Sequence, residues 1–305
     1  MTALRSLAAT ARARPALAAL ALMLAATLFL AAMHGAVRFV SAEMHAFEIA
    51  FFRNVFGFCV LVPRLMRIGL AAFATHRFPL HAARGLLNGG SMLMWFLGLS
   101  LIPLAEATAL SLASPLIATA GAIVFLGERM RGHRWLGLAL GVAGMLAILR
   151  PGFEEIGTGA MAVLLSAVLV TASKLIAKSL TRTETPTAIV AWLTALMIPV
   201  TAIPAALVWQ TPTAAQLAML AGIGALGSAG HLCLIHAYRL ADVGLVEPLV
   251  FFRLVWAALL GFLVFAEIPD LWIWIGGLLI VAATTHLARR EGGPSIRRPP
   301  GSYSG

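Results

Sequence analysis

Ten apolar runs, each long enough to cross a lipid bilayer, dominate the 305-residue sequence. A spanning helix needs about 20 mostly apolar residues. Only 11% of the residues are charged, against roughly a quarter in a soluble domain, so a normal water-soluble surface is excluded. The sequence therefore predicts an all-α polytopic membrane protein, with spans at residues 16–36, 45–63, 80–100, 104–126, 134–150, 158–176, 186–208, 214–237, 243–265 and 271–288.

Lysine and arginine are distributed unevenly between the links that join these runs. If the N-terminus lies inside, 18 of the 22 basic residues fall on the inner side, and only Arg38 and Arg150 fall on the outer side. Cytoplasmic loops of membrane proteins carry such an excess. We therefore expect both termini in the cytoplasm and a multi-pass protein of the bacterial inner membrane. The net charge of +10 then needs no nucleic acid as a partner.

The chain divides near residue 153 into two halves with five runs each. Five is an odd number, so the halves must cross the membrane in opposite orientations. Inverted repeats of this kind are the architecture of many secondary transporters. We expect a first repeat over residues 1–152 with spans 1–5, a second over 153–288 with spans 6–10, and a disordered basic cytoplasmic tail over 289–305.

Both halves contain an apolar run that ends in a glutamate and leads through a short polar link into the next run. When Glu128 is aligned with Glu267, Trp135 meets Trp274, and Gly137 meets Gly276. The stretch from Pro103 to Gly152 resembles the repeat signature of the EamA family, within the drug/metabolite transporter superfamily. Its informative parts are the small-residue helix Ala105–Pro115, the Gly127-Glu128 end and the later Gly137, Gly141 and Gly144.

A second copy of the signature runs from Glu247 to Ile280, with Ala266 in place of the glycine before Glu267. The resemblance covers essentially the whole chain. It implies ten helices, two inverted five-helix repeats and a central cavity with alternating access. It also implies a small-molecule substrate, a class that includes amino-acid-derived metabolites, S-adenosylmethionine, riboflavin and opine-type metallophores. We expect export of an amino-acid-derived metabolite, such as an opine-type metallophore, with uptake of S-adenosylmethionine, riboflavin or a similar compound as the alternative.

Two arginines, Arg53 and Arg253, lie inside the second and ninth runs, where topology does not explain them. Charged groups in a bilayer are expensive and so mark functional positions by default. One interpretation is that each arginine pairs with a glutamate of another helix and holds the bundle together. The other is that they bind a substrate carboxylate, whose geometry matches a guanidinium.

Three acidic residues near or within the spans could carry a coupling proton, because burial disfavours their charged form. They are Glu48, Glu106 and Glu247. Glu106 stands at the start of a run, so capping of a helix start is its alternative role. We expect Glu128 and Glu267 to be structural, closing turns against neighbouring helices.

Three predicted helices have a polar face formed by residues three or four positions apart. We expect these faces to line the cavity, and Trp95 to stack on a planar part of the substrate. The alternative is that they form hydrogen-bonded seams between helices. The residues are Asn88, Ser91 and Trp95 in the third span, Thr108, Ser111 and Pro115 in the fourth, and Gly224, Ser228, His231 and Tyr238 in the eighth.

Other classes of protein find little support. The spans contain no HExxH or GxSxG motif and no aspartate pair. His231 and His236 are five residues apart, a spacing that directs the two side chains to different sides of a helix. The sequence therefore contains no recognisable catalytic group for an intramembrane enzyme. We expect no metal and no cofactor. No Walker A sequence supports drive by ATP. A non-transporting scaffold would have little use for buried charges. Small-residue faces could pack within one chain or between two, so a homodimer stays open.

Overall fold

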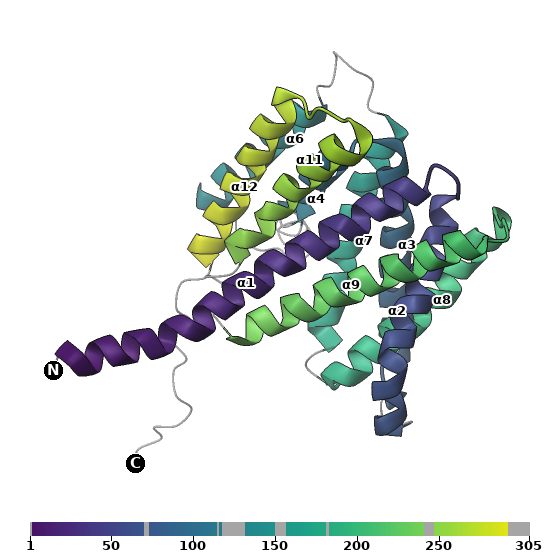
Figure 1. The fold of residues 1–305 in the computed structure, drawn as a ribbon, viewed down its shortest axis with the longest axis horizontal. Coiled ribbons are helices and arrows are strands. Elements are labelled where there is room, and N and C mark those ends of the chain that lie inside the picture. The colour runs from purple at the N-terminus through teal and green to yellow at the C-terminus, as the bar shows by residue number, and fades with distance from the viewer. Residues whose placement is uncertain are drawn as a thin grey trace.

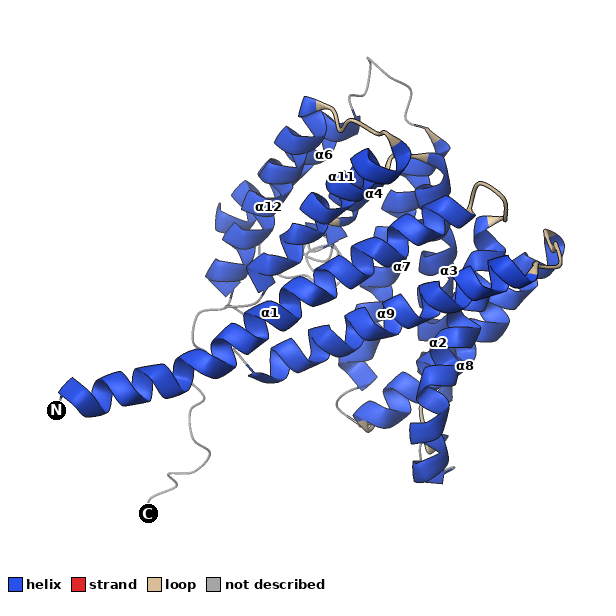
Figure 2. Cartoon of the chain, viewed as in Figure 1, coloured by secondary structure: helices blue, strands red, loops and turns tan. Residues whose placement is uncertain are grey.

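The computed structural model describes residues 2–69, 73–114, 116–117, 132–149, 157–180, 183–240 and 247–291. Within these ranges the chain forms helices joined by short links and contains no strand (Figure 2). The elements are α1 (Thr2–Val40), α2 (Ala46–Ile68), α3 (Phe78–Leu101), α4 (Leu104–Ser111), α6 (Gly132–Leu149), α7 (Thr158–Leu180), α8 (Pro186–Leu207), α9 (Ala214–Leu240), η2 (Glu247–Phe251), α11 (Phe252–Phe265) and α12 (Leu271–Glu291).

Each of the ten predicted runs contains a described helix, which confirms the all-α class. Two helix starts differ most from the predicted runs. Helix α1 begins at Thr2 rather than near residue 16, because the segment before the run is rich in alanine, the strongest helix former. The ninth run begins as the 3-10 turn η2 and continues as α11.

Four stretches are long and apolar enough to cross a membrane by length and composition: Leu17–Val40, Thr158–Ala177, Ala188–Leu207 and Ala214–Leu234. Shorter apolar helices cover Trp135–Leu149, Leu249–Phe265 and Leu271–His286. Large apolar side chains also cover the outside of the bundle, for example Leu207 at 84% exposure and Ile203 at 70%. Soluble monomers rarely expose such extensive apolar surface, so lipid is the expected surrounding of these helices.

The packing of the helices follows a pattern that exchanges the two halves of the chain. Helix α1 runs along α9, and α3 runs along α7 (Figure 1). We number the helices from one to five in each half. The α1–α9 contact then joins the first helix of the first half to the third helix of the second half. The α3–α7 contact joins the same two positions with the halves exchanged. Exchanging the halves likewise converts the α2–α9 contact into the α3–α8 contact. The contacts α2–α8, α6–α12 and α4–α11 each join equivalent helices of the two halves, so the exchange leaves them unchanged. This is the pairing that two similar five-helix units produce.

Glycines allow several of these pairs to approach closely. A Cβ atom on Gly144 of α6 would lie 2.7 Å from the carbonyl oxygen of Gly276 on α12. A Cβ on Gly276 would lie 2.5 Å from the carbonyl oxygen of Gly144. The backbones of α6 and α12 therefore touch, as in other membrane helices that meet through small residues.

We predict that Gly144→Ala lowers the free energy of unfolding by about 1–3 kcal/mol, the usual cost of overpacking. The methyl group would meet backbone atoms of α12, which cannot move aside as a side chain can. Gly222→Ala in α9 is the matched control, since a Cβ there meets nothing within 4 Å. Thermal unfolding in detergent compares the two variants. Equal midpoint temperatures of unfolding for the two variants would contradict the close α6–α12 contact.

Candidate functional site

Four basic side chains from four helices lie close enough to influence one another electrostatically. We call His34 of α1, Arg53 of α2, His231 of α9 and Arg253 of α11 the central basic cluster. Arg253, Arg53 and His231 all act electrostatically on His34, and both arginines act on His231. His34 is buried, with 6% of its surface exposed, whereas His231 is exposed and both arginines are half-buried.

Arg53 is held in place by its own helix and by α8. Its Nη1 donates to Oδ1 of Asn54 over 3.2 Å. The Nδ2 of Asn54 then donates to Oγ1 of Thr201 on α8, over 3.3 Å. Both Asn54 and Thr201 are buried. The orientation of the guanidinium therefore depends on a hydrogen-bonded link between α2 and α8.

Gly227 of α9 leaves the space that the Arg53 side chain occupies. A Cβ atom at Gly227 would lie 2.8 Å from Sδ of Met33 and 3.5 Å from Nη2 of Arg53. The carbonyl oxygen of Gly227 accepts a hydrogen bond of 2.7 Å from Nδ1 of His231. One small residue thus makes room for one member of the cluster and orients another.

Arg253 reaches α4, the fourth helix of the first half. Its Nη2 donates to Oγ of Ser111 over 2.9 Å, and Ser111 Oγ donates to the carbonyl oxygen of Thr108 over 2.7 Å. The Nε of Arg253 is buried and has no hydrogen-bond partner among the described residues. One donor of this guanidinium therefore has no acceptor within the part of the chain that the structure describes.

The partners of both arginines are neutral. In the described part of the chain, neither Arg53 nor Arg253 has a carboxylate within ion-pair distance. The glutamates described here thus do not supply the structural pairing that was one interpretation of these residues. A buried charge without a counter-charge is costly. Among the described residues, the two guanidinium groups are therefore only partly satisfied.

Two tryptophans lie beside the cluster. The Trp95 ring of α3 meets His34 edge to face, with centroids 5.1 Å apart. Trp256 is one turn after Arg253 on α11, and its Nε1 donates to Oγ1 of Thr27 on α1 over 3.1 Å. Sequence reasoning singled out Trp95 but missed Trp256 and His34. Trp256 could have been found from its position three residues after Arg253, which places both on one helix face. His34 could have been found as the lone histidine in the first apolar run.

The remaining residues of the third-span face lie at a helix interface. Asn88 Nδ2 donates to Sδ of Met197 over 3.2 Å, and Asn88 Oδ1 accepts from Oγ of Ser173 over 3.4 Å. Ser91 donates to the carbonyl oxygen of Ser166 over 2.9 Å. These bonds join α3 to α7 and α8, which is the seam that was the alternative for this face.

The predicted faces in the other two helices are described in part. In the fourth span, Ser111 joins the cluster, while Thr108 is buried and its Oγ1 has no partner among the described residues. In the eighth, His231 joins the cluster and Gly224 packs closely on Phe56 of α2. Pro115 and the side chain of Tyr238 lie outside the described residues.

The three acidic candidates lie apart from one another or outside the description. Glu48 is fully buried; its Oε1 accepts from the backbone N of Gln210 over 3.0 Å, and its Oε2 has no partner among the described residues. It thus fixes the α8–α9 link to the start of α2. Glu106 lines a cavity of ≈ 340 Å³ together with Glu267 and Asp270. The side chain of Glu247 lies outside the described residues, as does Glu128.

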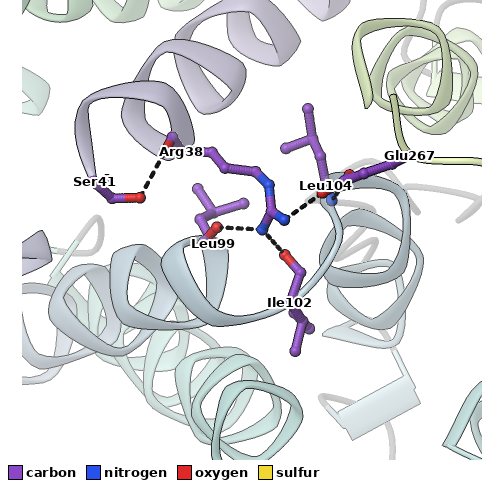
Figure 3. Close-up of polar contacts among 6 residues, drawn as sticks. All are labelled: Arg38, Ser41, Leu99, Ile102, Leu104 and Glu267. Carbon is purple, nitrogen blue, oxygen red and sulfur yellow. Dashed lines mark hydrogen bonds and ion pairs between the residues drawn. The ribbon is translucent and has the colours of Figure 1, made fainter. Parts of the chain in front are cut away.

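A second polar group joins the two halves at the end of the bundle where α1 ends. Arg38 donates from Nη1 to the carbonyl oxygens of Leu99, over 3.0 Å, and Ile102 (Figure 3). Its Nη2 donates to the carboxylate of Glu267, and the other oxygen of Glu267 accepts from the backbone N of Leu104 over 3.1 Å. We call this group the Arg38–Glu267 bridge. As expected, Glu267 closes a turn against neighbouring helices.

The bridge is positioned by an unusual turn at the end of α11. Ala266 has a φ of 53°, the left-handed region that favours glycine. The backbone N of Glu267 donates to the carbonyl oxygen of Gly261 over 3.0 Å, which closes the helix. The departure from the repeat signature at Ala266 therefore carries a conformational cost, yet the turn still directs Glu267 towards Arg38 and Leu104.

The fold and the cluster define a polytopic helical membrane protein with a polar interior site between two repeated units. A model of the EamA-like transporter family matches residues 17–150 and, a second time, residues 157–288. The chain belongs to the EamA-like transporter family. It is therefore a membrane transporter with a small-molecule substrate, and the expectation that it is not an enzyme is confirmed.

Several characterised relatives are similar over most of their length. A riboflavin transporter from Rhizobium johnstonii is 37% identical over 243 residues, which cover 79% of this chain and 80% of that protein. An S-adenosylmethionine uptake transporter from Rickettsia bellii is 31% identical and covers 83% and 87%. A pseudopaline exporter from Pseudomonas aeruginosa is also 31% identical and covers 86% and 92%.

A solved crystal structure has the same fold. Its TM-score is 0.60 at 22% sequence identity, and the match covers 90% of this chain and 99% of that one. At this identity the likeness concerns the fold alone.

We predict that Ala266→Gly raises the free energy of unfolding by up to about 1 kcal/mol. The left-handed conformation costs an L-residue about 1–2 kcal/mol, while the extra chain entropy of glycine costs about 0.4–1 kcal/mol. As a control, Ala282→Gly in the exposed interior of α12 should lower stability by about 1 kcal/mol. Thermal unfolding measures both. A loss of stability in Ala266→Gly would contradict the strained turn.

Proposed function

We propose that this protein is a secondary transporter that moves a small organic solute bearing a carboxylate by alternating access. The observation that carries the proposal is the pair of arginines, Arg53 and Arg253, whose described hydrogen-bond partners Asn54 and Ser111 are neutral. A carboxylate matches the planar fork of a guanidinium and would supply the negative charge that the described residues do not provide.

The surroundings of the cluster support an organic substrate rather than an inorganic anion. Trp95 and Trp256 add aromatic surface beside the basic groups. Transporter sites commonly lie near the middle of the bilayer at the interface between repeats. Here α1, α2 and α4 of the first half and α9 and α11 of the second supply the charges and their partners.

An amino-acid-derived metabolite fits these features, because it combines a carboxylate with a larger apolar or planar part. Export of such a compound, for instance an opine-type metallophore, is our first proposal, supported by the similarity to a pseudopaline exporter. Uptake of S-adenosylmethionine or riboflavin is the second, supported by the similarity to transporters named for them. Riboflavin has no carboxylate. If it is the substrate, the two arginines would donate hydrogen bonds to its neutral oxygen atoms.

The remaining expectations from the sequence belong to the same proposal. We place both termini in the cytoplasm and the protein in the bacterial inner membrane, on the distribution of lysine and arginine. The repeats are proposed at residues 1–152 and 153–288, with a basic tail at 289–305. Glu48, Glu106 and Glu247 stay candidates for proton coupling, and a homodimer stays open.

The direct test is metabolite profiling of cells and medium in a strain that lacks the gene. Export predicts that one carboxylate-bearing compound accumulates in the cells and disappears from the medium. Uptake predicts that a supplied compound, S-adenosylmethionine or riboflavin, stays in the medium. If no compound changes its distribution, the proposed function is wrong.

For the compound so identified, we predict that Arg53→Gln and Arg253→Gln each raise the KM for transport by about 10- to 100-fold. A hydrogen bond to a charged group contributes about 1.5–3 kcal/mol, and 1.4 kcal/mol is a factor of ten. Arg67→Gln, which changes an exposed arginine at the end of α2, is the matched control. Initial rates in proteoliposomes give the KM. An unchanged KM in both cluster variants would remove the arginines from the site.

A further inference from the structure

We propose that the Arg38–Glu267 bridge is a gate, which closes one end of the transport path over the central basic cluster. The inference rests on the proposed function, because a gate requires a path. It assigns to Arg38 and Glu267 a role beyond holding the fold together. Opening at this end would require the guanidinium to leave the carboxylate and the carbonyl groups of Leu99 and Ile102, at the end of α3, that it now contacts.

The first argument is the position of the bridge between the two repeats. Arg38 lies in the last turn of α1 and contacts the C-terminal end of α3, while Glu267 follows α11 and its carboxylate caps the start of α4. Three helices of the first half are thus tied to one loop of the second. In alternating access the two repeats move relative to each other. A contact that crosses between them at one end must therefore break when that end opens.

The second argument is that the bridge and the cluster are built on the same helices. His34 precedes Arg38 by one turn of α1. On α4, Leu104 contacts the bridge and Ser111 contacts Arg253, two turns further along. Arg253 and Glu267 lie near opposite ends of α11. A movement of α4 away from α11 would therefore disturb both the bridge and the Ser111–Arg253 bond.

The third argument is that one carboxylate performs two tasks that fail together. Glu267 neutralises Arg38 and accepts the first free backbone N–H of α4. The side chains of Arg38 and Glu267 are only 19% and 17% exposed, so water screens their attraction less than it screens a surface pair. The closed arrangement is therefore well defined, and loss of the single negative charge weakens two contacts at once.

The bridge also has room to open. Glu267 lines the cavity of ≈ 340 Å³, together with Pro103, Ala105 and Ile268. The side chain of Glu267 therefore borders open space and is not enclosed by packed side chains on every side. A purely structural ion pair in a filled core would lack this space.

The test measures access to α4 below the bridge and needs no substrate. The reporter is Thr108→Cys, in a chain whose two native cysteines, Cys59 and Cys233, are changed to serine. Thr108 is 1% exposed and lies between Leu104 and Ser111 on α4. The probe is the membrane-impermeant reagent methanethiosulfonate ethylsulfonate, applied to right-side-out and inside-out membrane vesicles. We expect Glu267→Gln to speed modification of the reporter about tenfold from one side only, as a shift towards the open population requires.

Three controls define the result. Glu43→Gln removes another carboxylate at the same end, one that accepts from Nε2 of Gln216 and is exposed, and should leave the rate unchanged. Arg38→Gln should have the same effect as Glu267→Gln, and it serves if that variant fails to fold. A second reporter, Ser166→Cys, is buried between α3 and α7 and should stay slow in both variants.

The gate is overturned if folded Glu267→Gln and Arg38→Gln proteins leave the Thr108→Cys rate unchanged. It is also overturned if Ser166→Cys accelerates equally, because the bridge would then only hold the bundle together. A failure of the proposed function gives a different result. The gate would still respond to these substitutions while metabolite profiling detects no transported compound.

Discussion

The cost of placing polar groups in an apolar medium controls this structure at every level. Backbone groups in a bilayer must bond within the protein, and helices satisfy them locally. The same cost applies to side chains, so each buried charge requires a partner. Arg38 meets it with a carboxylate and two carbonyl groups. Within the part of the chain that the structure describes, Arg53 and Arg253 meet it only in part, with neutral partners. This difference from Arg38 is the reason why we propose these two arginines as substrate-binding groups.

Much of the fold could be predicted because the length of an apolar run is a local property. The helices therefore lie where the runs predict them, and the glutamate landmarks indicate the repeats. The partners of the polar residues could not be predicted in this way. Arg253 and Ser111 were both selected from their own helices, but they are 142 residues apart, and spacing along one helix carries no information about the other.

The contacts of other polar residues could not be predicted from the sequence for the same reason. Asn88 and Ser91 share a face with Trp95, yet their polar groups bond to α7 and α8. A helix inside a bundle has neighbours on several sides, so a polar stripe can serve an interface as well as a cavity. The positive-inside rule assigns Arg38 to a side of the membrane, but it carries no information about the groups that the side chain contacts. His34 has no periodic companion in its run and was missed.

The exchange of helix pairs between the halves has a consequence for the energy of the resting protein. The α1–α9 contact includes Gly230 against Leu30, and its counterpart α3–α7 includes Gly98 against Val163. Two conformations that open opposite ends would use these joints in exchanged roles. Under the proposed alternating access, their free energies would differ through the differences between corresponding residues, such as Leu30 and Val163. If the protein alternates between two such conformations as proposed, the side chains at these joints contribute to which of them is more populated.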